Sequence, residues 1–250
     1  MLDIREKYRY SNLMSIENSY AIPSWRDGEL RTATNADAAL VRLKRDILRG
    51  ELAPDERLRV RVLMRKYGIG ASPMREALAQ LAGAGFVRLE GQKGFRVSPV
   101  GRADLLDITR SRQIVEPEAF VLAIKAADEL WEAELLKAFH LLSRELSRRV
   151  DASKEWLDKF EARHHAFHRA LIAPCPLRYL REFCDDLYLH GERYRRTLMG
   201  YSFDTRDVAA EHENLMKAAL SRNAKRARKE IIAHIALTAD LLGLLPEETS

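Results

Sequence analysis

The sequence has few cysteines and no long apolar run, and both absences narrow the classes of protein to which it can belong. Its two cysteines, Cys175 and Cys184, do not form a C-x-x-C motif, which favours a reducing, cytoplasmic compartment. No apolar stretch approaches the ~18–20 residues that cross a membrane. The first 20 residues carry scattered charges and lack the apolar region of a secretory signal. We therefore expect a cytoplasmic protein with no membrane contact.

The common catalytic motifs are also absent. The sequence contains no H-E-x-x-H arrangement, no Gly-rich phosphate loop and no Ser-His-Asp set, and this argues against an enzyme. Its 250 residues are 46% hydrophobic and 32% charged, which is typical of a globular chain with a real core. That length allows one large domain or two ordinary ones.

A helix, a turn, a second helix and a hairpin are predicted between residues 60 and 97. Residues 60–67 have helical spacing, residues 68–70 suit a tight turn, and Ser72 is placed to cap a second helix that ends at Gly85. Two short strand-like runs then flank the sequence GQKG and predict a hairpin. This order is typical of a winged helix-turn-helix, although a helical pair followed by an unrelated hairpin gives the same pattern.

The positive charge of the chain lies in this same segment. Residues 35–100 contain 13 Lys or Arg against 7 Asp or Glu, a net charge of +6, whereas residues 1–34 contain 5 of each and residues 101–250 contain 24 against 25. Such segregation indicates a domain that faces phosphates. The candidate contacts to double-stranded DNA are Arg59, Arg61 and Arg65 for phosphates, Ser72 and Arg75 in the second helix, and Gln92, Lys93 and Gly94 at the hairpin tip.

Residues beyond 101 are helix formers almost without interruption. Six segments show apolar residues at spacings of three and four, namely 104–127, 128–149, 153–173, 177–199, 207–220 and 224–242. Pro117 predicts a kink or a break in the first segment, and residues 200–205 are expected to form a turn. The predicted fold is mainly α, with an N-terminal winged helix-turn-helix and a C-terminal all-α antiparallel bundle.

The predicted division of the chain has five parts. They are a loosely ordered arm at 1–33, a DNA-binding domain at 34–98, a linker at 99–101, a helical effector-binding and dimerisation domain at 102–244, and a tail at 245–250.

Four histidines of the helical segment are candidate metal ligands. His164 and His168 are four residues apart and so share one helix face, and a helical hairpin can bring His212 level with His234. Neutral imidazoles in this arrangement suit zinc or nickel. A histidine pair at this spacing also occurs on surfaces and in cores without any metal. His165 falls on the adjacent face and is expected to be solvated.

Two parts of the chain resemble one bacterial family. Residues 40–97, with ILRGELAPDERL, PMREAL and GFVRLEGQKGFRV, resemble the DNA-binding domain of GntR-type transcription regulators. The helical part, with residues 112–116, FHRAL, EHENLMKAAL and His234, resembles the FCD ligand-binding domain of one subfamily. In detail the match is to the carbon-starvation-induced branch that responds to glutarate. The resemblance implies a homodimeric repressor that binds a pseudo-palindromic operator.

The resemblance also implies a ligand site. In the family a carboxylate and three histidines usually hold a divalent metal, and these histidine positions match His168, His212 and His234, whereas the carboxylate position falls at His164. This departure leaves a four-histidine site, a changed metal preference, or no metal with the imidazoles binding the effector directly. The implied effector is a small carboxylate such as glutarate, and the candidate residues for its recognition are Arg112, Tyr194 and Arg195.

Two further departures concern the DNA-binding part. Asp55 stands where the family usually has Gly, and Ala71 stands where members place an Arg on a base, so the usual operator sequence is not expected. The alternatives to a regulator are a metal-dependent enzyme acting on a small organic acid and a helical adaptor protein.

Overall fold

The computed structural model describes residues 34–149 and 153–239, together with residues 243 and 245. The predicted arm and most of the predicted tail lie outside these residues. The elements in chain order are α1 (Asn35–Leu48), β1 (Arg57–Leu58), α2 (Val60–Tyr67), α3 (Ala71–Gly83), β2 (Val87–Leu89), a 3₁₀ turn (Gly91–Lys93), β3 (Phe95–Val97), α4 (Arg102–Ala126), α5 (Glu129–Ser147), α6 (Lys154–Ile172), α7 (Arg178–Thr205), α8 (Val208–Leu220) and α9 (Ala224–Ala239).

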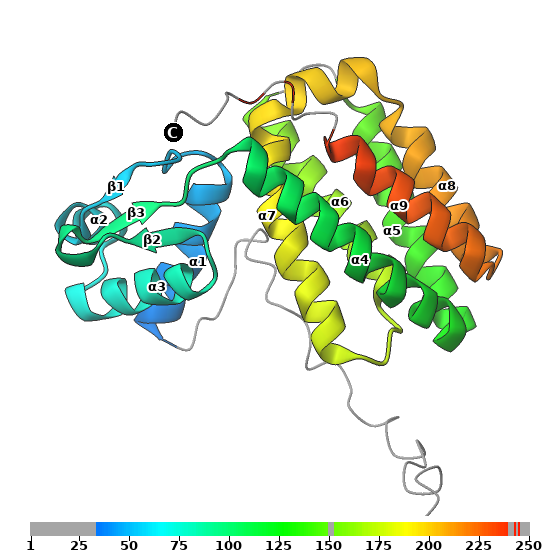
Figure 1. Ribbon diagram of the computed structural model, residues 1–250, viewed down its shortest axis with the longest axis horizontal. Coiled ribbons are helices and arrows are strands. Elements are labelled where there is room, and N and C mark those ends of the chain that lie inside the picture. The colour runs from blue at the N-terminus through cyan, green and yellow to red at the C-terminus, as the bar shows by residue number, and fades with distance from the viewer. Residues whose placement is uncertain (1–33, 150–152, 240–242, 244, 246–250) are drawn as a thin grey trace, which may run out of the picture.

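Figure 1 shows two lobes, which we call the winged-helix lobe (residues 34–99) and the helical lobe (residues 102–239). The three strands form an antiparallel sheet in the order β1-β3-β2, with Arg57 opposite Arg96 and Val87 opposite Val97. The hairpin of β2 and β3 was predicted. Strand β1 was not, because a strand of two residues is too short to show an alternating pattern.

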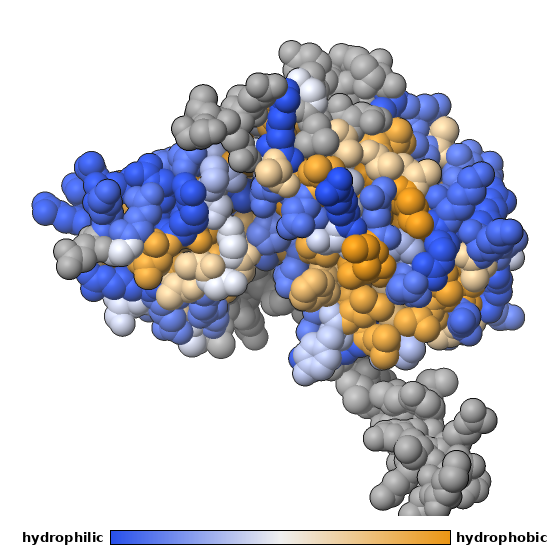
Figure 2. Space-filling model, in the orientation of Figure 1, coloured by the Kyte–Doolittle hydropathy of each residue, from blue (hydrophilic) through white to orange (hydrophobic). Residues whose placement is uncertain are grey.

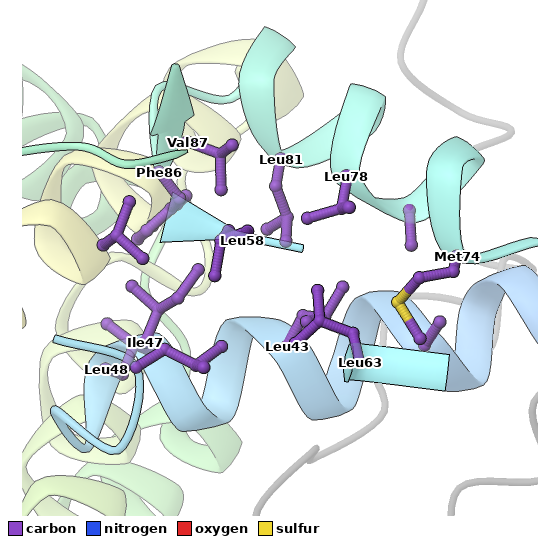
Figure 3. Packing of buried hydrophobic residues seen from close by; sticks show 14 of the residues in the cluster. Leu43, Ile47, Leu48, Leu58, Leu63, Met74, Leu78, Leu81, Phe86 and Val87 are labelled. Carbon is purple, nitrogen blue, oxygen red and sulfur yellow. The ribbon is translucent and has the colours of Figure 1, made fainter. Parts of the chain in front are cut away.

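The first lobe is held together by apolar residues from α1, α3 and the sheet. Leu43 and Ile47 of α1 face Leu78 and Leu81 of α3, and Phe86 closes one end (Figure 3). Each fully buried side chain of this size contributes about 1.5–3 kcal/mol. The buried residues of α3, namely Met74, Ala77, Leu78 and Leu81, lie at helical spacing and form one apolar face. Two residues of the other lobe, Tyr188 and Leu189 of α7, belong to the same core cluster.

The ends of the helices in this lobe depend on caps and glycines. The hydroxyl of Thr34 accepts the Asp37 N–H at 3.1 Å and caps the start of α1. The predicted Ser72 cap is wrong, because α3 begins at Ala71 and its N-cap is the extended residue Gly70. Gly85 follows α3 with φ +78°, the left-handed conformation that ends a helix.

The helical lobe packs α4 against α7 and α9, and α5 against α6 and α8. In Figure 1, α7 lies on the side of this lobe that faces the winged helix. Pro117 lies inside α4 without dividing it, so the predicted break is wrong. The predicted turn at residues 200–205 is also wrong, because α7 continues to Thr205. Gly200 costs a helix interior only about 1 kcal/mol, which tertiary packing can offset. No helix in the described part of the chain is both long and apolar enough to span a bilayer.

The backbone conformation at residue 55 explains why Asp can stand where the family usually has Gly. Its φ is +62°, a left-handed conformation that glycine adopts freely and that costs most other residues about 1–2 kcal/mol. Aspartate tolerates this region better than most residues, and its carboxylate also pairs with Arg88 at 2.7 Å. The position therefore requires Gly, Asp or Asn on conformational grounds.

Substitutions at Asp55 test this reasoning. Asp55→Val should lower the free energy of unfolding by about 1–2 kcal/mol, because a β-branched residue is strained at positive φ. Asp55→Gly should leave it within about 1 kcal/mol of the wild type, because the relief of strain offsets the loss of an exposed ion pair. Urea unfolding measures both. Equal losses from the two substitutions would show that the carboxylate matters and the backbone conformation does not.

Candidate metal centre and DNA-facing surface

Four histidines meet inside the helical lobe. His164 and His168 come from α6, His212 from α8 and His234 from α9, and one ring nitrogen of each lies within 4.8 Å of the others. All four side chains are buried, with exposed fractions of 8% or less. We call this set the histidine cluster. The sequence suggested that these helices could bring the four together, and they do so.

Hydrogen bonds at the outer nitrogens fix how two of the rings are presented. His212 Nδ1 lies 2.6 Å from the Val208 carbonyl, and His234 Nδ1 lies 3.0 Å from a carboxylate oxygen of Glu211. Both Nδ1 atoms are therefore donors, and both Nε2 atoms keep a lone pair. His212 Nε2 is buried and has no hydrogen-bond partner among the described residues. Such an orphaned atom costs about 1–3 kcal/mol, and a metal ion would satisfy it.

His164 and His168, the two rings from α6, lie close together, and His164 also has partners at its outer nitrogen. His164 Nε2 lies 3.1 Å from His168 Nε2, and His164 Nδ1 lies 2.8 Å from the Tyr188 hydroxyl and 3.7 Å from a Glu161 carboxylate oxygen. Glu161 and Tyr188 therefore stand behind His164 as partners stand behind a metal-ligating histidine. The donor set fits a borderline divalent ion such as zinc or nickel, which accepts imidazole nitrogen.

Two carboxylates near the cluster were missed by sequence reasoning. Glu161 is fully buried, and its two oxygens accept from Arg195 at 3.1 and 3.0 Å. Glu211 accepts from Arg206 as well as from His234. Their positions in the sequence carry a weak signal, since Glu161 is three residues before His164 and Glu211 directly precedes His212.

The electrostatics favour neutral rings beside ionised acids. Burial lowers the pKa of His164 to about 3, and burial together with neighbouring positive charge lowers the pKa of the other three rings. Burial alone would raise the pKa of Glu161, but Arg195 and His164 hold that pKa well below its usual value. At neutral pH the cluster therefore presents four unprotonated imidazoles, the state that a metal requires.

The candidate effector residues divide into two groups. Arg112 and Arg195 lie over the ring of Tyr188 at 5.7 and 4.4 Å, and a methyl group on Gly191 would lie 3.3 Å from a terminal nitrogen of each. The two guanidinium groups thus meet beside the cluster. Tyr194 is occupied elsewhere, because its hydroxyl donates to Asp104 at 2.5 Å and its ring packs in a separate apolar cluster.

A small cavity of about 20 Å³, with room for about one water molecule, adjoins His168. Its lining includes Glu116, Tyr188, Cys184, Asp185 and His165. The expectation that His165 is solvated is wrong. Its ring stacks on Tyr188 with centroids 4.4 Å apart, and its Nε2 lies 2.5 Å from Asp185. Glu116 accepts the Arg112 guanidinium, so this side of the cluster already contains a paired carboxylate.

The predicted DNA contacts lie on the outer part of the winged-helix lobe, where Figure 2 shows mainly hydrophilic residues. The side chains of Ser72, Arg75 and Lys93 are exposed, as are those of Arg59, Arg61 and Arg65. No described carboxylate pairs with Arg59, Arg61 or Arg75. Gln92 and Lys93 belong to the 3₁₀ turn, and Gly94 has φ +87°, so the hairpin tip requires glycine there. The exposed side chains of Arg59, Arg61 and Arg75 are therefore available for contacts with DNA phosphates.

Comparison with known proteins agrees with both lobes. Residues 35–97 match the family described as bacterial regulatory proteins, gntR family, and residues 107–237 match the FCD domain. The chain is 37% identical over 198 residues to the HTH-type transcriptional repressor GlaR of Escherichia coli, covering 77% of this chain and 89% of GlaR. The chain belongs to the GntR family. It is a transcription regulator of the GntR type with an FCD domain.

Other relatives support the same conclusion. The regulator is 33% identical over 199 residues to the HTH-type transcriptional regulator BphR of Paraburkholderia xenovorans, covering 80% of this chain and 81% of BphR. The structure of E. coli McbR/YncC matches with a TM-score of 0.71 at 20% identity, over 85% of this chain and 99% of that one, and it supports the fold alone. These families and relatives are transcription regulators, which decides against the enzyme alternative. Members of the family bind operator DNA and typically act as dimers.

The lowered histidine pKa values predict how stability depends on pH. An unfolded chain takes up protons on its histidines as pH falls through ~6.5, whereas the buried rings do so only at lower pH, near 3 for His164. The free energy of unfolding of the chelator-treated chain should therefore fall below pH ~6.5, by about 1.4 kcal/mol per pH unit for each buried ring.

Urea unfolding across this pH range measures the slope. His212→Asn should make the slope shallower. His140→Gln should leave the slope unchanged, because His140 is exposed on α5. This substitution serves as the control for the loss of one imidazole. A slope that is unchanged by His212→Asn would contradict the assignment of neutral, buried rings.

Proposed function

We propose that this regulator is a repressor whose operator binding is controlled by a small carboxylate held beside a divalent metal ion in the helical lobe. The observation that carries the proposal is the buried His212 Nε2, which has no partner among the described residues and faces three other imidazoles. The name of the relative GlaR, a transcriptional repressor, supports repression as the mode of action.

The four ligands would be His164, His168, His212 and His234. When bound, the metal would supply a centre of positive charge that accepts a carboxylate oxygen. Four imidazoles leave the full double charge of the ion in place, whereas a carboxylate among the ligands would reduce it by one. The site therefore favours zinc or nickel over magnesium, which prefers oxygen.

A dicarboxylate suits a metal ion that has two guanidinium groups near it. One carboxylate would face the metal, and the other would face Arg112 or Arg195, which lie over Tyr188. Both guanidinium groups already bind a glutamate, Glu116 and Glu161 respectively. A guanidinium group has five N–H donors, so it can bind a glutamate and a ligand at the same time. Glutarate is the probe of choice because it carries two carboxylates on a short chain.

The winged-helix lobe would bind the operator through two kinds of contact. Arg59, Arg61 and Arg65 would meet phosphates and fix the position of the lobe, while Arg75 would reach a base edge from α3. Lys93 at the hairpin tip would lie near the minor groove. Two copies of the chain would present two α3 helices to a pseudo-palindromic site.

The metal and the effector can be tested together in the full-length chain. Chelator-treated protein should bind about one Zn²⁺ or Ni²⁺ per chain by calorimetry, and glutarate should raise its melting temperature only when the metal is present. His168→Ala should abolish both effects, whereas the control His140→Ala should abolish neither. A full glutarate response from demonstrably metal-free protein would remove the metal from the proposal.

His164→Asp tests the role of charge in the same assay. The substitution restores a carboxylate at this position, so the metal should remain bound while the site becomes one charge less positive. Glutarate affinity should fall by at least about tenfold, which corresponds to about 1.4 kcal/mol, because a like charge now lies a few ångströms from the ligand. Unchanged or tighter glutarate binding would show that the charge of the site does not select the ligand.

The separate roles of Arg75 and Lys93 in DNA binding can be tested with one DNA duplex. This duplex is first selected from a random pool by its binding to the full-length chain. Arg75→Ala should reduce the preference for this duplex over an unrelated one by about 1–3 kcal/mol. Lys93→Ala should instead weaken binding to both duplexes and flatten the salt dependence by about one unit. Lys225→Ala, an exposed cation on α9, serves as control. Identical effects of the first two substitutions would contradict the separate roles.

A further inference from the structure

A short segment of α7, residues 188–193, contacts the histidine cluster and the winged-helix lobe at once. Tyr188 and Leu189 are buried in the core cluster of the winged-helix lobe. The Tyr188 hydroxyl also lies 2.8 Å from His164 Nδ1 and 3.2 Å from Glu161. One side chain is therefore shared between the proposed ligand site and the core of the DNA-binding lobe.

His190 contacts the winged-helix lobe through both its ring face and its Nε2 atom. Its ring stacks on Phe86 with centroids 4.4 Å apart and an interplanar angle of 13°. Its Nε2 lies 3.0 Å from the carbonyl oxygen of Ala84, which ends α3. His190 thus touches both the end of α3 and Phe86, the residue directly before β2.

Gly85 makes this approach possible. A Cβ atom on this residue would lie 3.3 Å from His190 Cε1, which is tighter than an ordinary contact. Its φ of +78° is also strained for any other residue. The glycine therefore serves both the end of α3 and the close packing of α7 against it.

Two further contacts hold the lobes in one arrangement. Arg193 Nη2 donates to the carbonyl oxygen of Ser98 at 2.5 Å, directly before the linker. On α6, Asp158 binds Arg49 of α1 at 2.8 Å and Arg196 of α7 at 2.9 Å. Asp158 lies six residues before His164 on the same helix. Helices α6 and α7, which make these contacts, therefore also carry or contact the histidine cluster.

The hydroxyl of Tyr188 is sensitive to what binds the cluster. A ligand on His164 Nε2 requires the ring proton to sit on Nδ1. The Tyr188 oxygen must then accept from Nδ1, and its own proton must turn to Glu161, which lies within reach at 3.2 Å. Tyr188 and His190 are two residues apart on one rigid helix, separated by a rise of about 3 Å. A displacement of Tyr188 is therefore carried to His190.

We propose that residues 188–193 of α7 transmit occupancy of the histidine cluster to the DNA-binding lobe, with His190 as the positioning residue that acts through Phe86 and Ala84. The proposal rests on the proposed function in that a ligand binds at the cluster. Its consequence for DNA follows from geometry. A dimer reads two half-sites about 34–36 Å apart, so a small rotation of each winged-helix lobe moves both α3 helices out of register with the operator.

Amide hydrogen exchange tests the proposal in the full-length chain, with Zn²⁺ alone as the probe. Zn²⁺ should slow exchange in α6, α8 and α9 of the wild type and also change exchange at residues 84–87, by about fivefold or more. In His190→Ala the effect at residues 84–87 should disappear while the effect in the helical lobe remains. His190→Phe keeps an aromatic ring against Phe86 and should transmit part of the effect, and His140→Ala should behave as the wild type.

A full Zn²⁺ effect at residues 84–87 in His190→Ala would overturn the proposal. The absence of any Zn²⁺ effect in the helical lobe of the wild type would contradict the proposed function instead. In that case a measurement of DNA affinity, made without any ligand, tests whether His190 couples the two lobes. Tyr188→Phe removes only the hydroxyl. It should change affinity for the selected duplex about fivefold in the wild type and leave it unchanged in His190→Ala. Equal changes in both backgrounds would show that His190 does not carry the coupling.

Discussion

The burial of four imidazole rings in one small volume is the constraint on which the helical lobe depends. Removing them from water keeps the rings neutral, and the outer nitrogens of His212, His234 and His164 are held by a carbonyl, a carboxylate and a hydroxyl respectively. The inner nitrogens do not all satisfy one another, because His212 Nε2 is buried without a hydrogen-bond partner among the described residues. The core is therefore built around a position that favours a cation, and the packing of α6, α8 and α9 follows from the need to bring the rings together.

Charge around the cluster is balanced in pairs. Arg195 neutralises Glu161 and Arg206 neutralises Glu211, while Arg112 and Glu116 form a third pair beside the cavity. Buried ions are tolerated only when they are paired and hydrogen-bonded. Each pair contributes donors or acceptors without adding net charge. In the proposed site, the charge that a ligand meets would therefore be that of the metal ion, and the surrounding pairs would orient the ligand more than they attract it.

Local patterns in the sequence predicted much of this structure. Helix α2 has its predicted bounds, and the four histidines chosen as candidate ligands from their spacing lie together. The failures were tertiary in origin. Tyr188 is 24 residues from His164 in the sequence, and only the packing of α6 on α7 makes it a partner of that ring. In the same way, Tyr194 resembled a cavity residue by sequence, but the packing of α7 on α4 places its hydroxyl on Asp104. A turn was expected at residues 200–205 because glycine disfavours a helix, but α7 continues through them, since packing can override this local preference.

The linker between the lobes is bonded along its length. Arg193 holds the carbonyl oxygens of Ser98 and Pro99, and the Tyr194 hydroxyl accepts the N–H of Gly101. These bonds limit how such regulators can be recombined. In a chimera joined at residues 99–101, the linker would come from one parent, and the α7 side chains that bind the linker would come from the other. The α7 helix would also face a foreign surface where it packs against Gly85 and Phe86. Exchange of sensor domains among relatives, in evolution or by engineering, therefore requires α7 and the end of α3 to be inherited together.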